Sequence, residues 1–240
     1  MAKVVFGPLV TDVRKKISGV VFSKAHFGAY TRKKVSPVQP RTTAQRAVRA
    51  NFTATSKAWS GTLSATERAT FVALAASLTK KDHFGQSYTQ TGAQLYMSIT
   101  RNLHTIGLAP LTSAPQTQSV SDLGGLLLQE ITSPDSPYLG PGLKITPTNN
   151  PASGEGMVIT ATAPEPAGRA FVGKSRYRII GYISVWPTSP ATSFPLDITE
   201  MYQTKFGQLE SGQTIHVQVN NINSTNGAAG KPYPASITLS

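Results

Sequence analysis

The sequence predicts an α+β protein in which a basic β-hairpin arm and a three-helix domain precede an antiparallel β-sandwich. Three observations predict this fold class: short strand patterns before residue 34, a helical period after Pro40, and a period of two beyond Gly142. The chain has 240 residues, of which 39% are hydrophobic, and this is enough to bury a core in more than one domain. We therefore expect an arm at 1–41, a helical domain at 42–110, a linker at 111–142 and a sandwich at 143–240.

The arm contains the most strongly charged segment of the chain. Residues up to Pro110 include 16 basic and 3 acidic residues, a net charge of +13, whereas the remainder has 7 basic and 8 acidic residues, a net charge of −1. Because like charges at this density repel one another, we expect the segment to meet an anionic partner; the alternative is a solvated basic face. Ten residues, which no Asp or Glu interrupts, are the predicted partner-binding residues: Arg14, Lys15, Lys16, Lys24, Arg32, Lys33, Lys34, Arg41, Arg46 and Arg49.

Strand patterns occupy Lys3–Phe6, Ile17–Ser23 and Gly28–Lys33, and a Pro-bounded corner follows at Ser36–Pro40. An isolated hairpin is marginal in water, so we expect the arm to lie on another element. Three aromatic residues interleave the charges: Phe22, Phe27 and Tyr30. They could stack on single-stranded nucleic acid, or they could anchor the strands on a core.

Three helices are predicted between Pro40 and Pro110. The first begins at Thr42, three residues before a Gln, and places Val48, Phe52, Thr55 and Trp59 at helical spacing. The second begins at the capping box Ser64–Glu67. The third carries its apolar residues from Tyr96 to Ile106. Arg46 and Arg49 lie on a face of the first helix that we expect to be solvated.

The segment beyond Gly142 alternates with a period of two. Its clearest alternation sets Ile215, Val217 and Val219 against His216, Gln218 and Asn220, which predicts one buried and one wet face. Gly, Pro or Asn turns separate six strand patterns, at 143–146, 157–163, 177–186, 194–198, 214–222 and 235–239.

Few groups suited to catalysis occur in the sequence. There is no cysteine, and none of the four histidines, His26, His83, His104 and His216, has a second His or a carboxylate three or four residues further on. Nucleophile-elbow, Walker and dinucleotide-binding motifs are absent from the sequence. We therefore expect a non-enzyme with no catalytic, cofactor-binding or metal-binding residues. Without a long apolar run, we also expect no membrane partner.

Two strings near the N-terminus resemble the opening of a family of largely uncharacterised proteins encoded by tailed phages and prophages: Ser18 to Arg32, and Val38 to Arg49. Trp59 before Ser64–Arg68, and the run from Gly92 to Asn102, are also similar. The resemblance covers about residues 17–115 and implies a structural protein of the virion, with no assigned site residues. Residues 143–240 more loosely resemble fibronectin type III or immunoglobulin-like sandwiches.

The leading hypothesis is a non-catalytic phage virion protein, associated with the capsid as a decoration, minor capsid or connector component. It would be made in the bacterial host cytoplasm and would assemble with other virion proteins and with copies of itself through the basic arm. One alternative is a nucleic-acid-binding module that uses the same arm to bind DNA. A second is a host-surface or carbohydrate-binding protein that uses the loops of the sandwich.

Overall fold

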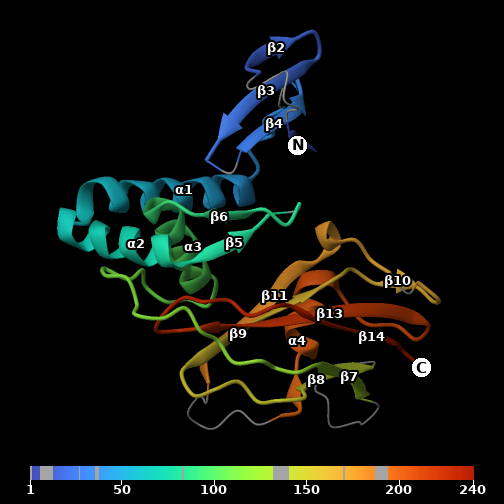
Figure 1. The fold of residues 1–240 in the computed structure, drawn as a ribbon. Coiled ribbons are helices and arrows are strands. Elements are labelled where there is room, and N and C mark those ends of the chain that lie inside the picture. The colour runs from blue at the N-terminus through green and yellow to red at the C-terminus, as the bar shows by residue number, and fades with distance from the viewer. Residues whose placement is uncertain are drawn as a thin grey trace. The chain divides into compact units, whose positions relative to one another are not determined.

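The structure is a computed structural model, and it describes residues 2–5, 13–26, 28–35, 38–82, 84–131, 141–169, 171–186 and 194–240. Helices and antiparallel sheets both occur, which confirms the predicted α+β class (Figure 1). The chain divides into two compact units, Met1–Met97 and Ser98–Ser240. This division falls inside a helix, whereas the predicted linker is at 111–142. Phe27, Ser36, Pro37, His83 and residues 132–140 lie outside the described residues.

An antiparallel sheet of four strands opens the first unit. Its order is β1 (Ala2–Lys3), β4 (Gly28–Lys33), β3 (Val20–Ala25) and β2 (Lys15–Ile17). The β2–β3 connection passes through Ser18 at a φ of 52°, and the β3–β4 connection ends at Gly28 with a φ of 112°. Such tight connections match the twist of neighbouring antiparallel strands. The arm is therefore a small sheet with β1 and β2 at its edges.

Three helices follow the sheet: α1 (Thr43–Lys57), α2 (Ala65–Ser77) and α3 (Gly92–Thr105). The Thr42 hydroxyl accepts the amide of Gln45, and Ser64 and Glu67 form a reciprocal capping box at the start of α2. Thr91 and Gln94 exchange the same pair of bonds at the start of α3. These contacts satisfy amide groups that the first turn of a helix leaves without a partner. The described part of the chain holds a fourth helix, α4 (Thr199–Phe206), which the sequence analysis did not predict.

Aromatic side chains form the core of the first unit. Trp59 lies in a π-helical turn, η1 (Ala58–Thr62), that continues α1. Its ring centroid is 6.1 Å from that of Phe71 and 5.6 Å from that of Tyr96, and the last two are 5.2 Å apart. Edge-to-face and tilted rings at these separations attract one another in addition to burying apolar area. This cluster therefore joins α2 and the first half of α3 to the end of α1.

A short hairpin anchors the arm within the first unit. Its strands, β5 (Thr79–Lys81) and β6 (Ser87–Thr89), lie between α2 and α3, in a stretch where the sequence analysis predicted no strand. The carboxylate of Asp82 accepts the amides of Phe84 and Gln86 at 2.8 and 3.0 Å and pairs with the Lys3 ammonium of β1. Lys3 also donates to the Gln86 side chain at 2.9 Å. These contacts join the arm to the β5–β6 hairpin, so the arm lies on another element as expected.

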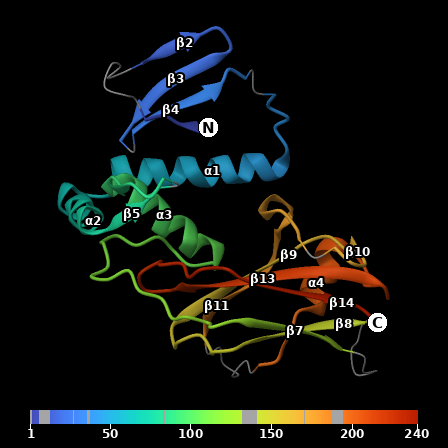
Figure 2. The ribbon, with the colours of Figure 1, turned by 45° about the vertical axis from the view of Figure 1, so that its right-hand side comes forward.

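Two antiparallel sheets make up most of the second unit (Figures 1 and 2). One hydrophobic cluster takes Leu128 and Ile145 from the smaller sheet and Ile159 and Val217 from the larger, so the two sheets share a core. The smaller sheet has the order β12 (Leu196–Asp197), β8 (Gly142–Pro147) and β7 (Leu126–Ile131). The larger has the order β10 (Glu165–Pro166), β13 (Gln213–Asn223), β9 (Glu155–Ala161) and β11 (Arg178–Trp186), with β14 (Tyr233–Thr238) paired to β13.

Two elements of the second unit differ from the sequence-based expectation. β7 lies within the predicted linker and pairs with β8 along its whole length. Helix α4 packs against β11, where a Cβ at Gly181 would lie 2.4 Å from the sulfur of Met201. The same helix is hydrogen-bonded to β8, because the hydroxyl oxygen of Thr199 accepts a hydrogen bond of 2.9 Å from the backbone amide of Leu143. The absence of a side chain at Gly181 leaves room for the side chain of Met201.

Candidate functional site

The ten predicted partner-binding residues are all exposed, and all lie in the first unit. Their positions follow from the local folding of the arm and of α1. Arg14, Lys15 and Lys16 lie at or before β2, Lys24 lies on β3, and Arg32, Lys33 and Lys34 lie on or just after β4. Arg41, Arg46 and Arg49 lie at the start of α1 or on it.

The register of the sheet divides the arm's charges between its two faces. Lys33 is opposite Val20, Arg32 is opposite Val21, and Lys24 is opposite Ala29. Because successive side chains of a strand point to opposite faces, Lys24 and Lys33 share one face with Phe22, and Arg32 lies on the other. The basic residues therefore make the arm cationic on both sides.

The same register separates the aromatic residues. Phe22 is opposite Thr31 and Ser23 is opposite Tyr30, so Phe22 and Tyr30 point to opposite faces of the sheet. Both are half-buried. Two rings on opposite faces do not form one platform on which successive bases could stack. Of the two aromatic residues that the structure describes on these strands, Phe22 is the one that shares a face with Lys24 and Lys33.

A surface hollow of about 430 Å³ lies on the arm. Besides Phe22, its lining includes four groups that are cationic or can become so: Arg14, Lys15, Lys24 and His26. No carboxylate from the described ranges of the chain lines it. Such a hollow suits an anion because several positive charges meet there. The ring of His26 lies 5.9 Å from that of Tyr88, edge to face, which helps hold this part of the sheet on β6.

The basic residues of α1 are held by local bonds. Arg41 has a φ of 52°, and its carbonyl accepts the Nε of Arg46 at 3.1 Å. This contact fixes the guanidinium of Arg46 near the first turn, where α1 has no acidic residue. An acid there would be favoured by the helix dipole, so its absence leaves this end of the helix wholly positive.

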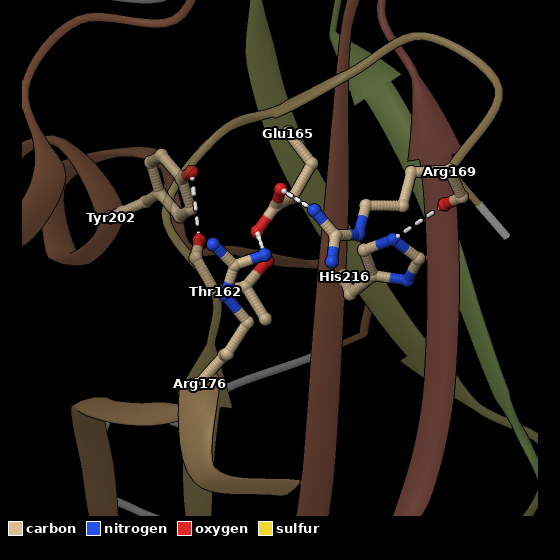
Figure 3. A network of polar contacts seen from close by, with 6 residues as sticks. All are labelled: Thr162, Glu165, Arg169, Arg176, Tyr202 and His216. Atoms are coloured by element: carbon tan, nitrogen blue, oxygen red, sulfur yellow. Dashed lines mark hydrogen bonds and ion pairs between the residues drawn. The ribbon is translucent and has the colours of Figure 1, made fainter. Parts of the chain in front are cut away.

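A polar network in the second unit escaped the sequence analysis (Figure 3). The buried carboxylate of Glu165 on β10 pairs with Arg169 at 3.0 Å and with Arg176 at 2.6 Å. The Nε2 of His216 lies 3.0 Å from the carbonyl of Arg169, and the hydroxyl of Tyr202 donates to the carbonyl of Thr162 at 3.0 Å. Glu165 lies on a strand and Arg169 follows the next turn, so their four-residue spacing, which indicates an ion pair only on a helix, gave no usable signal in the sequence.

This network corrects the prediction that His216 lies on a wet face. Ile215, Val217 and Val219 are fully buried, as the alternation predicted. His216 is also buried, with only 4% of its surface exposed. The segment after β9 covers this side of β13, and the contact with the Arg169 carbonyl satisfies the ring. Alternation reports which residues share a face, but it does not report whether a loop covers that face.

The contacts of the Glu165 network stabilise the fold of the second unit. Both carboxylate oxygens of Glu165 are held by guanidinium groups, which fixes the orientation of the carboxylate. Burial, and secondarily the charge of Glu165, raises the pKa of Tyr202 well above its ordinary range, so its hydroxyl stays a proton donor. Among the described residues, no three His, Asp or Glu side chains gather in a way that could hold a metal ion.

A second buried carboxylate fastens the segment before β7. Glu155 accepts the amide and the hydroxyl of Ser121 at 2.7 and 2.5 Å and the side-chain amide of Asn221 at 2.7 Å. Asn221 also donates to the Ser121 carbonyl at 2.8 Å. This cluster joins β9, β13 and the segment between α3 and β7, which is why that segment belongs to the second unit.

No helix in the described ranges is both long enough and apolar enough to cross a membrane. The ten basic residues of the arm and α1 given above are all exposed, and we call them the basic surface. The buried polar networks of the second unit differ from it in this respect. Comparison of the chain with family models, with curated proteins and with solved structures finds no match, so the case for a function rests on the basic surface itself.

Proposed function

We propose that this chain is a non-catalytic structural protein of a tailed-phage particle, associated with the capsid or its connector, and that it assembles through the basic surface. One observation carries the proposal. Ten exposed cations are held on a folded sheet and helix without an acid in that stretch of sequence. A surface of this kind repels its own copies and attracts an anionic surface over a distance of about a Debye length. The resemblance of residues 17–115 to phage and prophage proteins supports the same role.

We further propose that the second unit is a fibronectin type III or immunoglobulin-like sandwich that presents the outward surface of the protein. Two antiparallel sheets that share one hydrophobic cluster support this assignment. The sheets leave β7 and β14 as strands paired on one side, and such strands can be extended by a neighbouring chain.

The assembly role is tested by charge reversal on one face of the arm. The triple variant Lys15→Glu, Lys24→Glu and Lys33→Glu should fold normally and should be depleted from purified particles at least tenfold relative to the parent chain. A control with two reversals, Lys174→Glu with Lys205→Glu, changes exposed lysines of the second unit and should be incorporated normally. Particles that lack the parent chain, or that incorporate the triple variant normally, would refute the proposal.

The hollow on the arm favours a second candidate function, the binding of DNA. Three permanent cations, Arg14, Lys15 and Lys24, line it beside Phe22. If they neutralise phosphates of a single strand, log affinity should fall with log salt concentration with a slope of about −2. Lys15→Glu with Lys24→Glu should reduce that slope, and the control pair at Lys174 and Lys205 should not. A double variant that loses DNA but still enters particles would assign the hollow to DNA and assembly to the rest of the basic surface.

A further inference from the structure

The described part of the arm adds no buried side chain to the first unit. None of the described side chains between residues 3 and 35 is buried, whereas α2 and α3 bury Phe71 and Tyr96. On the way from the arm to α1, Val35 is 68% exposed and Val38 is 90% exposed. Because burial of apolar side chains is the main force that holds elements together, we expect the position of the arm to depend on a few polar contacts.

One of these contacts joins two charges that are largely withdrawn from water. The ammonium of Lys3 on β1 pairs with Oδ2 of Asp82, the residue after β5, and the two side chains are 13% and 11% exposed. This oxygen is buried and accepts no hydrogen bond from the other described residues. Removal of one partner from such a pair leaves the other charge without compensation, which is strongly unfavourable. The pair therefore holds β1 on the hairpin.

The two oxygens of the Asp82 carboxylate have separate roles. Oδ1 accepts the amides of Phe84 and Gln86 at 2.8 and 3.0 Å, which orders the turn between β5 and β6. Oδ2 pairs with Lys3, whose ammonium also donates to the Gln86 side chain at 2.9 Å. The loss of the charge at Asp82 can therefore be separated from the loss of the turn.

The junction between the arm and the hairpin also contains a hollow. Its volume is about 460 Å³, and it is lined by His26 of the arm and by Thr79, Ser87, Tyr88, Thr89, Gln90 and Thr91. The rings of His26 and Tyr88 meet edge to face, with centroids 5.9 Å apart. Atoms that line a hollow lack contact partners on that side, so this junction gains less from packing than a filled interface does.

We propose that the Lys3–Asp82 pair is a latch that holds the arm sheet on the β5–β6 hairpin, and that the arm separates from the hairpin as an intact sheet when the pair is broken. The ladders of β3 with β2 and with β4 lie within the arm, so they do not depend on the latch. Separation would change the placement of the arm's cations relative to those of α1. The latch therefore determines whether the basic surface is one fixed array or two. This inference does not depend on the particle assignment.

The test measures the distance between the arm and α2 in the full chain. Because the chain has no cysteine, Val20→Cys on β3 and Ala73→Cys on α2, both at exposed positions, can be spin-labelled selectively. Double electron–electron resonance should give a narrow distribution of distances for the labelled parent. Lys3→Met should raise the ratio of the broad to the narrow component at least about tenfold, as loss of one partner of a mostly buried pair implies.

Further variants separate the latch from other effects. Asp82→Asn keeps an acceptor for the amides of Phe84 and Gln86 but presents no charge to Lys3, so it should broaden the distribution as Lys3→Met does. The combined variant should be no broader than either alone, because both changes remove the same contact. Lys3→Arg keeps the charge and should stay narrow. The matched control, Lys24→Met, removes an exposed lysine of the same sheet and should also stay narrow.

Hydrogen exchange shows whether the arm separates as an intact sheet. In Lys3→Met, the amides that pair β3 with β4 should exchange at the parental rate. Faster exchange would mean that the arm unfolds, and it would overturn the proposal. A broad distribution in the parent would also overturn it, as would a narrow one in both Lys3→Met and Asp82→Asn, or equal broadening by Lys24→Met. Only variants with parental helix content by circular dichroism enter the comparison.

Discussion

Removal of the charge of Glu165 should destabilise the second unit by about 2 kcal/mol. The Gln of Glu165→Gln has nearly the same shape, so the change removes charge without leaving a cavity. Hydrogen bonds to charged groups contribute about 1.5–3 kcal/mol each when fully buried. The side chains of Arg169 and Arg176 are 48% and 47% exposed, so both guanidinium groups regain water when the carboxylate is lost. The two contacts together are therefore discounted to about 2 kcal/mol.

The two tryptophans of the chain make this measurement specific. Trp59 belongs to the first unit and Trp186 to the second, where it is 8% exposed. In a Trp59→Phe background, urea unfolding followed by tryptophan fluorescence reports on the second unit alone. A loss of about 2 kcal/mol should also lower its Tm by about 6 °C, for a domain of about 150 residues.

The control for charge alone is Glu200→Gln. Glu200 is exposed in the first turn of α4, and its substitution should change stability by no more than about 0.5 kcal/mol. Addition of Arg176→Met to Glu165→Gln should cost less than Arg176→Met alone, because the partner has already gone. The reasoning is refuted if Glu165→Gln changes the free energy of unfolding no more than Glu200→Gln does. It is also refuted if the effects of Glu165→Gln and Arg176→Met on this free energy are additive.

Three further outcomes are expected. Gly156→Ala should destabilise the second unit by about 3 kcal/mol, since its Cβ would lie 2.5 Å from a backbone carbonyl oxygen of β11. The Cβ of Gly173→Ala would meet the Ser175 hydroxyl oxygen at 3.9 Å, an ordinary contact, so this change should be close to neutral, and thermal melts compare the two variants. Hydrogen bonds from Ser64 lower the pKa of Glu67, so their stabilisation is complete above the unfolded value of 4.5 and is lost as the pH falls through the folded pKa; acid titration of Ser64→Ala should be flatter in that range. The pKa of Tyr202 is raised, so stability should be complete below its unfolded value of 10.0 and should fall as the pH rises beyond it; Tyr202→Phe should remove this loss in alkaline melts.

Strong local signals made much of the fold predictable. The capping box at Ser64 marks the start of α2, and the alternation of β13 marks its buried face. The hairpin of β5 and β6 carried no such signal, because its strands have three polar or aromatic residues each and depend on the Asp82 side chain. Helix α4 is short, and its contacts with β8 through Thr199 and with β11 at Gly181 are tertiary, so no local pattern in the sequence indicated it.

The candidate site was predictable in composition but not in arrangement. The ten cations could be named from charge alone, and all ten are exposed. Their division between the two faces of the sheet depends on the strand register, which a one-residue shift would reverse. The exposure of Val48 and Phe52 could not be foreseen either, since the helical period shows that they share a face but not what covers it.

The edge of the arm sheet has a consequence for the timing of assembly. β2 is a strand of three residues at the edge, and all three, Lys15, Lys16 and Ile17, are exposed. Two lysines on so short an edge discourage the addition of a strand from another copy. If the chain has the proposed role, newly made copies should therefore stay apart at the high concentrations of an infected cell. In the proposed role, an anionic surface on the growing particle would neutralise these lysines and remove the repulsion. The protein would then assemble only after such a surface has formed.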